Sequence, residues 1–410
     1  MSKTILQINV CNNVFSTGKI VSEIGELAIN NGWDSYVAYG RGSKPDRNRQ
    51  IKIGWSLGHV LHGIETRLFD NHAIGISSYL ATKKLIRTIE KIRPDVIHLH
   101  VLSGYYINIR VLFKYLSKVD IPIVWTLHSC WEFTGHCTHY DYINCQKWKT
   151  GCESCPLKKE YPESWFIDRS AKNYKGKKRI FNSLKNVTLV PVSRWLSSQV
   201  EQSFLNRYPI QQIYNGVDIN FFRPLTNIEQ IRQELNVSDK CMLIALASSW
   251  TPKKGIADYF ELARKLDPKK YVLFMVGIEN SKHSDIPEAI RALPVTKDRY
   301  QLLKLYNAAD IVLNLSYEES FGLTTVEGLA CGTLSIVYNC TASPELVSPE
   351  TGFVVEPRNI QGLIDCINKI EITGKSYYSA ACRKRAEEHF NKDMCFEKYI
   401  ELYDSLINKE

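Results

Sequence analysis

Short apolar runs alternate with amphipathic stretches along almost the whole chain. In the first half, the runs that predict strands are residues 4–10, 35–40, 95–100, 122–128 and 187–193. The stretches that predict helices are 18–31, 79–91 and 106–118, with a further helix after residue 193. Strands that alternate with helices in this way are typical of parallel sheets covered by helices on both faces.

The same alternation fills the second half of the chain. The predicted strands there are residues 211–216, 241–248, 271–277, 311–315 and 333–338, and helices fill the C-terminus from about residue 359. The break in periodicity at NGVDINFFRP (215–224) predicts a linker. The pattern therefore predicts an α/β protein with two doubly wound domains.

The predicted boundaries divide the chain into three parts. Residues 1–210 form the first domain, with an irregular insertion at about 130–170, and residues 211–385 form the second. Residues 386–410 are expected to form a helix that packs back on the first domain. At 410 residues the chain is too long for one ordinary core, which agrees with two domains.

Composition narrows the class of protein. The hydrophobic content of 44%, with 8 Trp and 22 Tyr, excludes a disordered chain. The N-terminus MSKTILQINV resembles a first strand more than a signal peptide, and no apolar run approaches the roughly 20 residues of a membrane span. We therefore expect a cytoplasmic protein. Its net charge of +9 points to anionic partners such as phosphates, nucleic acid or an acidic membrane surface.

The segment ESFGLTTVEGLACG (319–332) carries two carboxylates eight residues apart. A helix is predicted to begin near Gly322 and to end at Gly332, so that Glu319 precedes the helix and Glu327 lies within it. Ligands of parallel sheets collect at strand carboxyl ends and helix N-termini, which would place Glu319 beside a ligand. The alternative is that both glutamates are simply solvated.

The order of motifs along the chain resembles glycosyltransferase family 4 enzymes of the GT-B fold. In the second half the motifs are WTPKKG (250–255), LYNAADIVLN (305–314), YEESFGLTTVEGLACGT (317–333) and SPELV (343–347). In the first half they are STGKI (16–20), DVIHLH (95–100), WTLH (125–128) and YNGVDINFFRP (214–224). The resemblance covers essentially the whole chain and is strongest to the bacterial branch that builds capsule, exopolysaccharide and O-antigen chains.

This resemblance implies a fold and an activity. The fold would be GT-B, with two Rossmann-like domains facing across a cleft, the first for the acceptor and the second for the donor. The activity would be that of a retaining hexosyltransferase that moves a sugar from a UDP- or GDP-sugar to a glycan or a polyprenyl-diphosphate-linked oligosaccharide. The leaving phosphate would take the acceptor's proton, so neither a dedicated base nor a catalytic cofactor or metal is expected.

The resemblance also assigns roles to individual residues. Glu319, Lys254 and His128 would act in catalysis, with Glu319 beside the donor sugar, Lys254 on the diphosphate and His128 near the reacting sugar carbon. Glu327 would accept hydrogen bonds from the ribose hydroxyls. The remaining donor-binding residues would be Gly18, Phe321, Gly322, Leu323 and Thr324.

Two of these positions leave alternatives open. Gly18 would allow a phosphate or the acceptor to approach the backbone, with Ser16 or Thr17 capping the helix, but a tight turn explains the same residues. The resemblance also implies an Arg six residues before Lys254, where this chain has Ser248. Another cation would then supply the charge, or the diphosphate would be held less tightly; the candidates are Lys19, Lys253 and Arg299.

The insertion contains a dense cysteine cluster. Four thiols fall within nineteen residues, and the last two have the spacing of a zinc knuckle. We expect a structural Zn²⁺ bound by these thiols, with free thiols or a disulfide as alternatives. The four cysteines are Cys137, Cys145, Cys152 and Cys155.

A basic segment with aromatic residues follows the insertion. Lysines and arginines of residues 165–185 lie among Trp165, Phe166, Tyr174 and Phe181. Such a helix would suit peripheral docking to anionic lipid headgroups at the inner face of the cytoplasmic membrane. The alternative is a solvated helix whose apolar side packs on its own domain.

Three other functions compete with a transferase. One is an inactive nucleotide-sugar-binding subunit of a polysaccharide assembly complex, which the missing Arg at Ser248 makes conceivable. Another is a sugar-nucleotide epimerase or phosphorylase on the same fold. A nucleic-acid-binding protein is the weakest, because the charge is not concentrated in a nucleic-acid module, so we expect no nucleic-acid partner.

Overall fold

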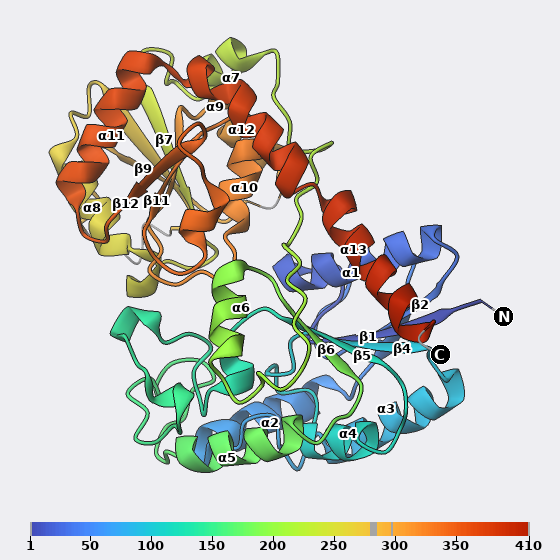
Figure 1. Cartoon of the computed structure of the whole chain (residues 1–410). Helices are drawn as coiled ribbons and strands as arrows, with labels where there is room; N and C mark the ends of the chain where they lie inside the picture. The colour runs from blue at the N-terminus through green and yellow to red at the C-terminus, as the bar shows by residue number, and fades with distance from the viewer. Residues whose placement is uncertain (1, 279–284, 297, 409–410) are drawn as a thin grey trace. The chain divides into compact units, whose positions relative to one another are not determined.

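The computed structural model describes residues 2–278, 285–296 and 298–408. The chain divides into two compact units (Figure 1). Unit 1 comprises Met1–Ile213 and Phe396–Glu410, and unit 2 comprises Tyr214–Cys395. Each unit contains a six-stranded parallel sheet with helices on its faces, so the predicted α/β class with two doubly wound sheets is confirmed.

The sheet of unit 1 has the strand order β3-β2-β1-β4-β5-β6, and every neighbouring pair is parallel. The five strands expected in this half are all present. The edge strand β3 was not expected, because its residues RQIK are mostly polar and none is buried. The strands are β1 Thr4–Asn9, β2 Asp34–Tyr39, β3 Arg49–Lys52, β4 Val96–Leu99, β5 Ile123–Leu127 and β6 Val187–Pro191.

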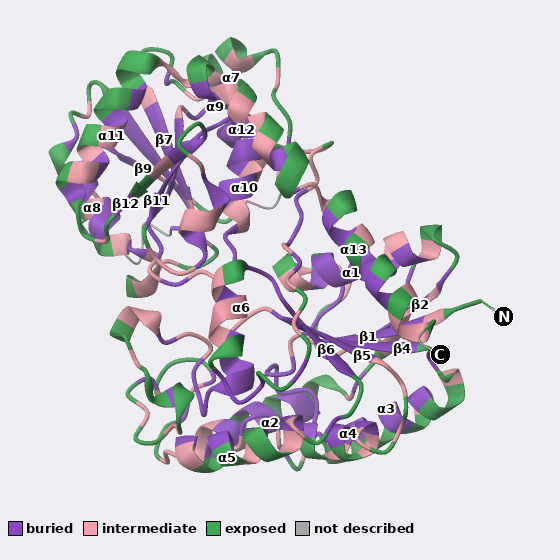
Figure 2. Ribbon diagram, viewed as in Figure 1, coloured by how far each residue is buried: buried purple, intermediate pink, exposed green. Residues whose placement is uncertain are grey.

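Six helices of unit 1 surround this sheet. Most bury an apolar face, as α3 does with Leu85, Ile86 and Ile89. Figure 2 shows the buried and exposed parts of these helices. The helix α2 was not expected from the sequence, and its buried face is not apolar. The helices are α1 Phe15–Asn30, α2 Ser56–Phe69, α3 Tyr79–Ile92, α4 Ile109–Leu116, α5 Ser170–Phe181 and α6 Arg194–Glu201.

The sheet of unit 2 has the order β12-β11-β10-β7-β8-β9, again all parallel. Its strands are β7 Cys241–Leu246, β8 Tyr271–Val276, β9 Ile290–Leu293, β10 Ile311–Asn314, β11 Ser335–Tyr338 and β12 Gly352–Val355. Its helices are α7 Ile228–Glu234, α8 Ile256–Lys265, α9 Arg299–Ala308, α10 Leu323–Ala330, α11 Ile360–Thr373 and α12 Lys375–His389. The edge strands β9 and β12 were not expected, since they are short and only partly buried.

The last helix, α13 (Lys392–Ile407), passes from unit 2 into unit 1. Within unit 1, the Tyr403 hydroxyl lies 2.6 Å from Nδ1 of His98, and Lys3 Nζ lies 2.5 Å from Asp404 Oδ1. These contacts hold the end of the chain against β1 and β4. The first boundary between unit 1 and unit 2 lies after Ile213. The expected linker 215–224 therefore lies inside unit 2.

The strand expected at residues 211–216 is wrong. No strand is formed over these residues, although the N–H groups of Gln211 and Ile213 donate to the carbonyls of Leu189 and Pro191 on β6. Isolated bridges flank the segment at Ile210 and Val217. The chain there leaves the edge of the first sheet, and Gly216 then packs so closely on Lys392 that a Cβ atom would clash with that residue's backbone. Gly216 therefore allows two chain segments to cross closely, and it does not belong to a sheet.

The insertion is irregular, as expected, and consists of loops with three short 3₁₀ turns. These turns are Trp131–Phe133, Asp141–Ile143 and Lys147–Lys149. Stacked aromatic rings pack it, including Tyr140 against Trp148 with centroids 4.9 Å apart. The buried ammonium of Lys177 on α5 donates to the carbonyls of Trp131 (2.6 Å) and Thr134 (3.1 Å), which anchors the insertion on α5.

Candidate functional site

Lys254 and Glu319 form an ion pair at the carboxyl-terminal edge of the second sheet. Lys254 Nζ lies 2.5 Å from Glu319 Oε1, and both side chains are partly exposed. Lys254 ends the 3₁₀ turn Pro252–Lys254 that follows β7, whereas Glu319 follows β10. Because β7 and β10 are parallel neighbours, their carboxyl ends bring these loops together. The structure thus joins the two donor-site residues expected from separate motifs.

Gly255 allows the lysine loop to approach β10. Its φ of +72° is unfavourable for a residue with a side chain, and a Cβ atom would clash with the carbonyl oxygen of Leu315. The backbone N–H of Tyr317 also donates to the carbonyl of Lys253 at 2.9 Å. This close approach fixes the position of Lys254 relative to the loop that carries Glu319.

The turn between Glu319 and α10 presents the start of a helix. Gly322, at φ +106°, is the N-cap of α10, and Phe321 beside it is buried. Leu323 and Thr324 form the first helical positions and are partly exposed. A helix N-terminus carries partial positive charge and N–H donors, so this turn favours an anionic or hydroxyl-bearing ligand.

Glu327 lies one turn further along α10 and is partly exposed. Its Oε2 accepts a hydrogen bond of 2.7 Å from the hydroxyl of Tyr306. Burial raises the pKa of Tyr306 well above its ordinary value, so this hydroxyl stays protonated and remains a donor. The bond fixes the orientation of the carboxylate, and α10 carries Glu327 and Thr324 on the same side, three residues apart.

The position of the missing arginine is exposed. Ser248 follows β7 and lies on the surface. Among the cations proposed to replace it, Lys253 is adjacent to Lys254 and binds Glu318 at 3.0 Å. Arg299 instead lies over the ring of Phe221 at 4.3 Å. Within unit 2, Lys253 is therefore the better placed of these two, while Lys19 belongs to unit 1.

In unit 1, His128 directly follows β5 and belongs to a chain of polar side chains across three strands. Its Nε2 lies 3.2 Å from Nδ1 of His100, whose Nε2 lies 3.2 Å from Oε1 of Gln7. Burial lowers the pKa of His128 to about 4, so the ring is neutral near pH 7. His128 is partly exposed, whereas His98 and His100 are buried and paired, as expected of core residues.

Gly18 lies in the first turns of α1 and is buried. A Cβ atom there would lie 2.9 Å from Cys11 Sγ and 3.3 Å from the Asn13 nitrogen, so packing against the loop after β1 already requires a small residue. The expected capping by Ser16 or Thr17 is wrong. The helix begins earlier, at Phe15, with Val14 at the N-cap and no side-chain cap.

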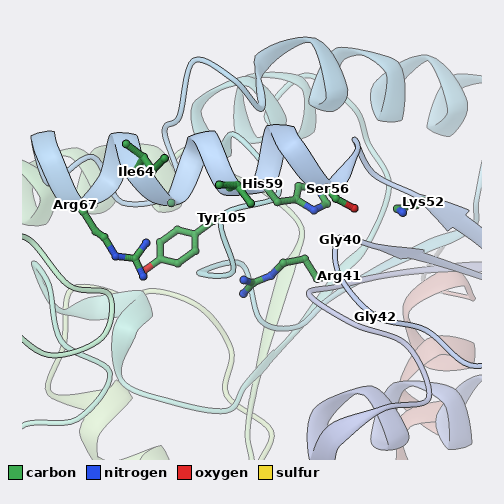
Figure 3. A pocket seen from close by; sticks show the side chains of 11 residues that line it. Gly40, Arg41, Gly42, Lys52, Ser56, His59, Ile64, Arg67 and Tyr105 are labelled. Carbon is green, nitrogen blue, oxygen red and sulfur yellow. The ribbon is translucent and has the colours of Figure 1, made fainter.

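A cavity of about 440 Å³ opens at the carboxyl-terminal edge of the first sheet (Figure 3). None of the residues that line it was expected as part of a site. Arg41 and Arg67 lie on either side of the Tyr105 ring, at 5.6 and 5.8 Å from its centre. Lys52, at the end of β3, adds a third cation, while Glu163 lies 3.5 Å from Arg67. The lining favours an anionic ligand. In the sequence, the cavity is indicated only by isolated basic residues at the ends of two successive strands, Arg41 after β2 and Lys52 at the end of β3.

The cysteines of the insertion are all reduced. The thiols of Cys137 and Cys155 share a hydrogen bond, which lowers the pKa of Cys155 to about 7. The N–H of Gly135 donates to Cys152 Sγ at 3.2 Å, yet burial raises the pKa of that thiol to about 11. The thiols of Cys137, Cys152 and Cys155 interact electrostatically, and so do those of Cys145 and Cys152. In the described residues, however, no three of the four thiols bring their Sγ atoms within 4.8 Å of one another. Zinc binding by them stays a prediction.

A second polar cluster joins the insertion to the loop after α2. His72 Nε2 and His136 Nδ1 lie 2.6 and 3.2 Å from Asp70 Oδ1, and all three side chains are buried. Within residues 2–278, 285–296 and 298–408, this is the one group of three His, Cys, Asp or Glu side chains whose potential metal-binding atoms all lie within 4.8 Å of one another. His136 is hydrogen-bonded to Asp70, so the cluster ties the insertion to the loop after α2, whereas the buried ring nitrogens of His72 have no hydrogen-bond partner among the described residues.

The basic helix is present as α5, and its burial agrees with the alternative in which its apolar side packs on its own domain. On α5, Tyr174, Lys177 and Phe181 are buried, and the exposed face carries Lys172 and Lys175 among other charges. Trp165 and Phe166 precede the helix and are exposed. In the described part of the chain, no helix is long and apolar enough to cross a membrane.

Known proteins resemble the chain over both units. The family model described as Glycosyltransferase Family 4 matches residues 18–221, and the model described as Glycosyl transferases group 1 matches residues 227–389. A putative colanic acid biosynthesis glycosyl transferase, WcaC, of Escherichia coli (strain K12) is 24% identical, covering 98% of this chain and 100% of that protein.

Two further proteins show what similar chains bind or act on. The N,N'-diacetylbacillosaminyl-diphospho-undecaprenol alpha-1,3-N-acetylgalactosaminyltransferase of Campylobacter jejuni is 23% identical, covering 47% of this chain and 53% of that protein. The crystal structure of Anabaena HepE in complex with UDP and glucose superimposes with a TM-score of 0.68 at 16% identity, covering 99% of this chain and 100% of that one.

Proposed function

Because the chain belongs to glycosyltransferase family 4, and is a GT-B glycosyltransferase of polysaccharide biosynthesis, we propose that it moves a sugar from a nucleotide donor to a lipid-linked glycan with retention of configuration. The observation that carries the proposal is the ion pair between Lys254 and Glu319 beside the N-terminus of α10. A sugar diphosphate requires groups that bind both negative charge and hydroxyls. The site offers a cation, a carboxylate and a helix N-terminus together, which no single one of these groups could replace.

In unit 2, each part of the donor has a matching group. The Lys254 ammonium and the N–H groups at the start of α10 stabilise the diphosphate, whose negative charge grows as the sugar–phosphate bond breaks. Glu319 both positions Lys254 and accepts hydrogen bonds from sugar hydroxyls. Glu327, oriented by Tyr306, accepts from the ribose diol. Lys253 offers the second positive charge that Ser248 does not provide.

In unit 1, His128 acts on the reacting sugar as a neutral ring. With a pKa of about 4 it carries no charge near pH 7, so it donates or accepts a hydrogen bond and does not act as a cation. The acceptor hydroxyl attacks the anomeric carbon from the face that the phosphate leaves, and the departing phosphate oxygen takes the proton. Catalysis then depends on positioning and charge stabilisation.

One relative and the net charge of the whole chain support the proposed acceptor class. The Campylobacter relative is named for a diphospho-undecaprenol acceptor, and the chain has a net charge of +9. An acceptor carried on a polyprenyl diphosphate would place the enzyme at the inner face of the cytoplasmic membrane. We also propose that Cys137, Cys145, Cys152 and Cys155 bind a structural zinc that braces the insertion.

A donor panel tests this function. The purified chain is incubated with UDP-, GDP- and dTDP-sugars and a polyprenyl-linked acceptor extract, and nucleoside diphosphate release is followed. Release that requires one donor and the acceptor together supports the transferase. Release from a donor without any acceptor contradicts it, and so does tight donor binding without turnover, which favours the inactive-subunit alternative.

The stereochemistry has its own readout. A retaining enzyme gives a product whose new linkage keeps the anomeric configuration of the donor, which nuclear magnetic resonance of the product reports directly. An inverted linkage would contradict same-face attack and would require a general base.

A further inference from the structure

The buried cluster of Asp70, His72 and His136 has no role in the proposed transfer. Asp70 is the C-cap of α2, His72 lies two residues further along the same loop, and His136 belongs to the insertion. Each of the three residues is at most 2% exposed. Because His72 Nε2 and His136 Nδ1 both lie close to Oδ1 of Asp70, at 2.6 and 3.2 Å, two distant segments of unit 1 meet at this carboxylate.

His136 cannot satisfy both of its polar contacts as a neutral ring. Its Nδ1 lies 3.2 Å from Asp70 Oδ1, and its Nε2 lies 3.4 Å from the carbonyl oxygen of Glu160. A carboxylate and a carbonyl only accept hydrogen bonds, whereas a neutral imidazole has a single N–H to donate. An N–H directed at Glu160 therefore leaves a lone pair on Nδ1 that faces the carboxylate. Either a second proton or a metal cation at Nδ1 removes this conflict.

His72 favours the metal cation over the second proton. Among the described residues, neither of its buried ring nitrogens has a hydrogen-bond partner, although Nε2 lies only 2.6 Å from Asp70 Oδ1. A second proton on His136 would leave both nitrogens of His72 buried and unpartnered, which is costly. A metal ion bound by Asp70 and His136 would also use the Nε2 atom of His72.

The atoms around the cluster orient it as a metal site requires. A histidine that binds a metal commonly donates its other ring N–H to a carbonyl, and the Glu160 carbonyl has this position for His136. The second carboxylate oxygen of Asp70, Oδ2, accepts from the backbone N–H of Arg169, which leaves Oδ1 for the ion. The rings of His72 and His136 lie side by side, with centroids 4.5 Å apart.

The ligand types indicate which ion the cluster would bind. Two imidazole nitrogens and one carboxylate oxygen suit Zn²⁺, whereas Mg²⁺ and Ca²⁺ prefer oxygen ligands. Asp168 interacts electrostatically with Asp70, so a second carboxylate helps to balance a divalent ion near the buried ammonium of Lys177. Because the three ligands are buried, the ion would be structural and would not contact the sugar substrates.

We propose that Asp70, His72 and His136 bind a zinc ion that joins the insertion to the loop after α2, with a water molecule as the fourth ligand. This site is separate from the four cysteines, although His136 precedes Cys137 in the sequence. Four thiolates bind zinc more tightly than this mixed ligand set. We therefore expect exhaustive dialysis to remove the ion from the site and added metal to restore it.

Cobalt titration of the dialysed full chain tests this proposal. Co²⁺ accepts the same ligands as Zn²⁺, and thiolate ligands give it a charge-transfer band in the near ultraviolet that nitrogen and oxygen ligands do not give. We expect the wild type to bind one equivalent of Co²⁺ more than His72→Gln does. The difference spectrum should show visible absorption without the thiolate band. Zn²⁺ should displace this equivalent, and Mg²⁺ should not.

A matched substitution separates the cluster from other buried histidines. His72→Gln and His136→Gln should each weaken binding of this equivalent by about a hundredfold or more, because each removes one of three ligands. His62→Gln is the control, because His62 is a buried histidine of α2 whose Nε2 accepts from the N–H of Gly75 at 3.1 Å. It should bind Co²⁺ as the wild type does.

A second measurement requires no variant to bind metal. Saturating Zn²⁺ should raise the Tm of the dialysed wild type by about 5 °C, since the ion binds only the folded chain. The same addition should raise the Tm of His72→Gln by less. Circular dichroism without metal shows whether each variant keeps the secondary structure of the wild type.

Three results would overturn the proposal. They are equal Co²⁺ binding by the wild type and His72→Gln, a difference spectrum that contains the thiolate band, and a Tm that Zn²⁺ raises equally in both proteins. The titration contains no sugar nucleotide and measures no transfer. A failure of this metal site therefore leaves nucleotide release unaffected, and a failure of the transferase leaves metal binding unaffected.

Discussion

The Nζ atom of Lys254 lies 2.5 Å from Oε1 of Glu319, although 65 residues separate them in the chain. Each residue belongs to a loop at the carboxyl end of a strand, and the two strands are parallel neighbours in one sheet. The pair couples the group proposed for the diphosphate to the group proposed for the donor sugar. A change at either residue should therefore affect the other.

We predict that Lys254→Gln lowers kcat/KM by about 10²–10³-fold, because it removes a charge that acts on the departing diphosphate. Lys265→Gln, an exposed lysine of the same region paired with Glu261, is the matched control and should have little effect. In a double-mutant cycle with Glu319→Gln, the combined loss should be smaller than the sum of the single losses. Strictly additive losses would contradict coupling of the pair.

Gly255→Ala should lower the free energy of unfolding of unit 2 by about 2 kcal/mol or more, since it forces a side chain into a left-handed conformation and against the Leu315 carbonyl. Gly176→Ala, in α5, is the control, because no atom lies within 4 Å of its new methyl group. That change should raise stability by about 0.5–1 kcal/mol. Chemical denaturation measures both, and similar effects of the two changes would contradict the close approach.

Lowering the pH should destabilise unit 1 already at pH values well above those at which carboxylates titrate. Burial lowers the pKa of His62 and His128 to about 4 and that of His98 and His100 well below its ordinary value. Since these pKa values lie below the unfolded value of about 6.5, the unfolded chain binds more protons as the pH falls. The contribution of these histidines should be complete above about pH 7 and decline from pH 6.5 toward 4, by roughly 1 kcal/mol or more per histidine at pH 5.

One group opposes this trend. Burial raises the pKa of Glu132 to about 7, so its contribution is present below its unfolded pKa of about 4.5 and is lost as the pH rises toward 7. The effect of four histidines is larger than that of one carboxyl. The denaturation midpoint of unit 1 should therefore decrease when the pH is lowered from 7 to 5. A midpoint that is flat or rises over this interval would show that the histidines titrate normally.

The purified chain should contain one equivalent of zinc, and Cys152→Ser/Cys155→Ser should lose it together with order in the insertion. Cys366→Ser, a thiol of α11 in unit 2, is the control and should retain the metal. Elemental analysis after exhaustive dialysis measures the metal. Absence of zinc from the wild type, or equal zinc in both variants, would favour a packed loop of free thiols.

Much of the fold follows from apolar periodicity. Buried parallel strands such as β5 and β6 are short apolar runs, and the run over 311–315 correctly predicts β10 before the Glu319 turn. The helix that follows Glu319 and contains Glu327 begins after Gly322, as its glycine suggests. The sequence thus predicts the elements of the proposed donor site and the order in which they follow one another.

The features that were missed have a common cause. The edge strands β3, β9 and β12 are four residues long and at most half buried, so their residues give no long apolar run. The helix α2 buries glycines and histidines and exposes leucines, so its pattern does not indicate which face packs. The cavity gathers Arg41, Lys52 and Arg67 from three separate segments, and only the tertiary structure brings them together.

The mass of the lipid-linked acceptor tests the central proposal most directly. After incubation with the donor that supports nucleotide release, mass spectrometry should show the acceptor heavier by one sugar residue with the wild type and with the control Glu261→Gln, an exposed carboxylate of α8. With Glu319→Gln, this product should form at least about a hundredfold more slowly. Undiminished product with Glu319→Gln would contradict the account of the site, and an unchanged acceptor with the wild type would contradict transfer itself.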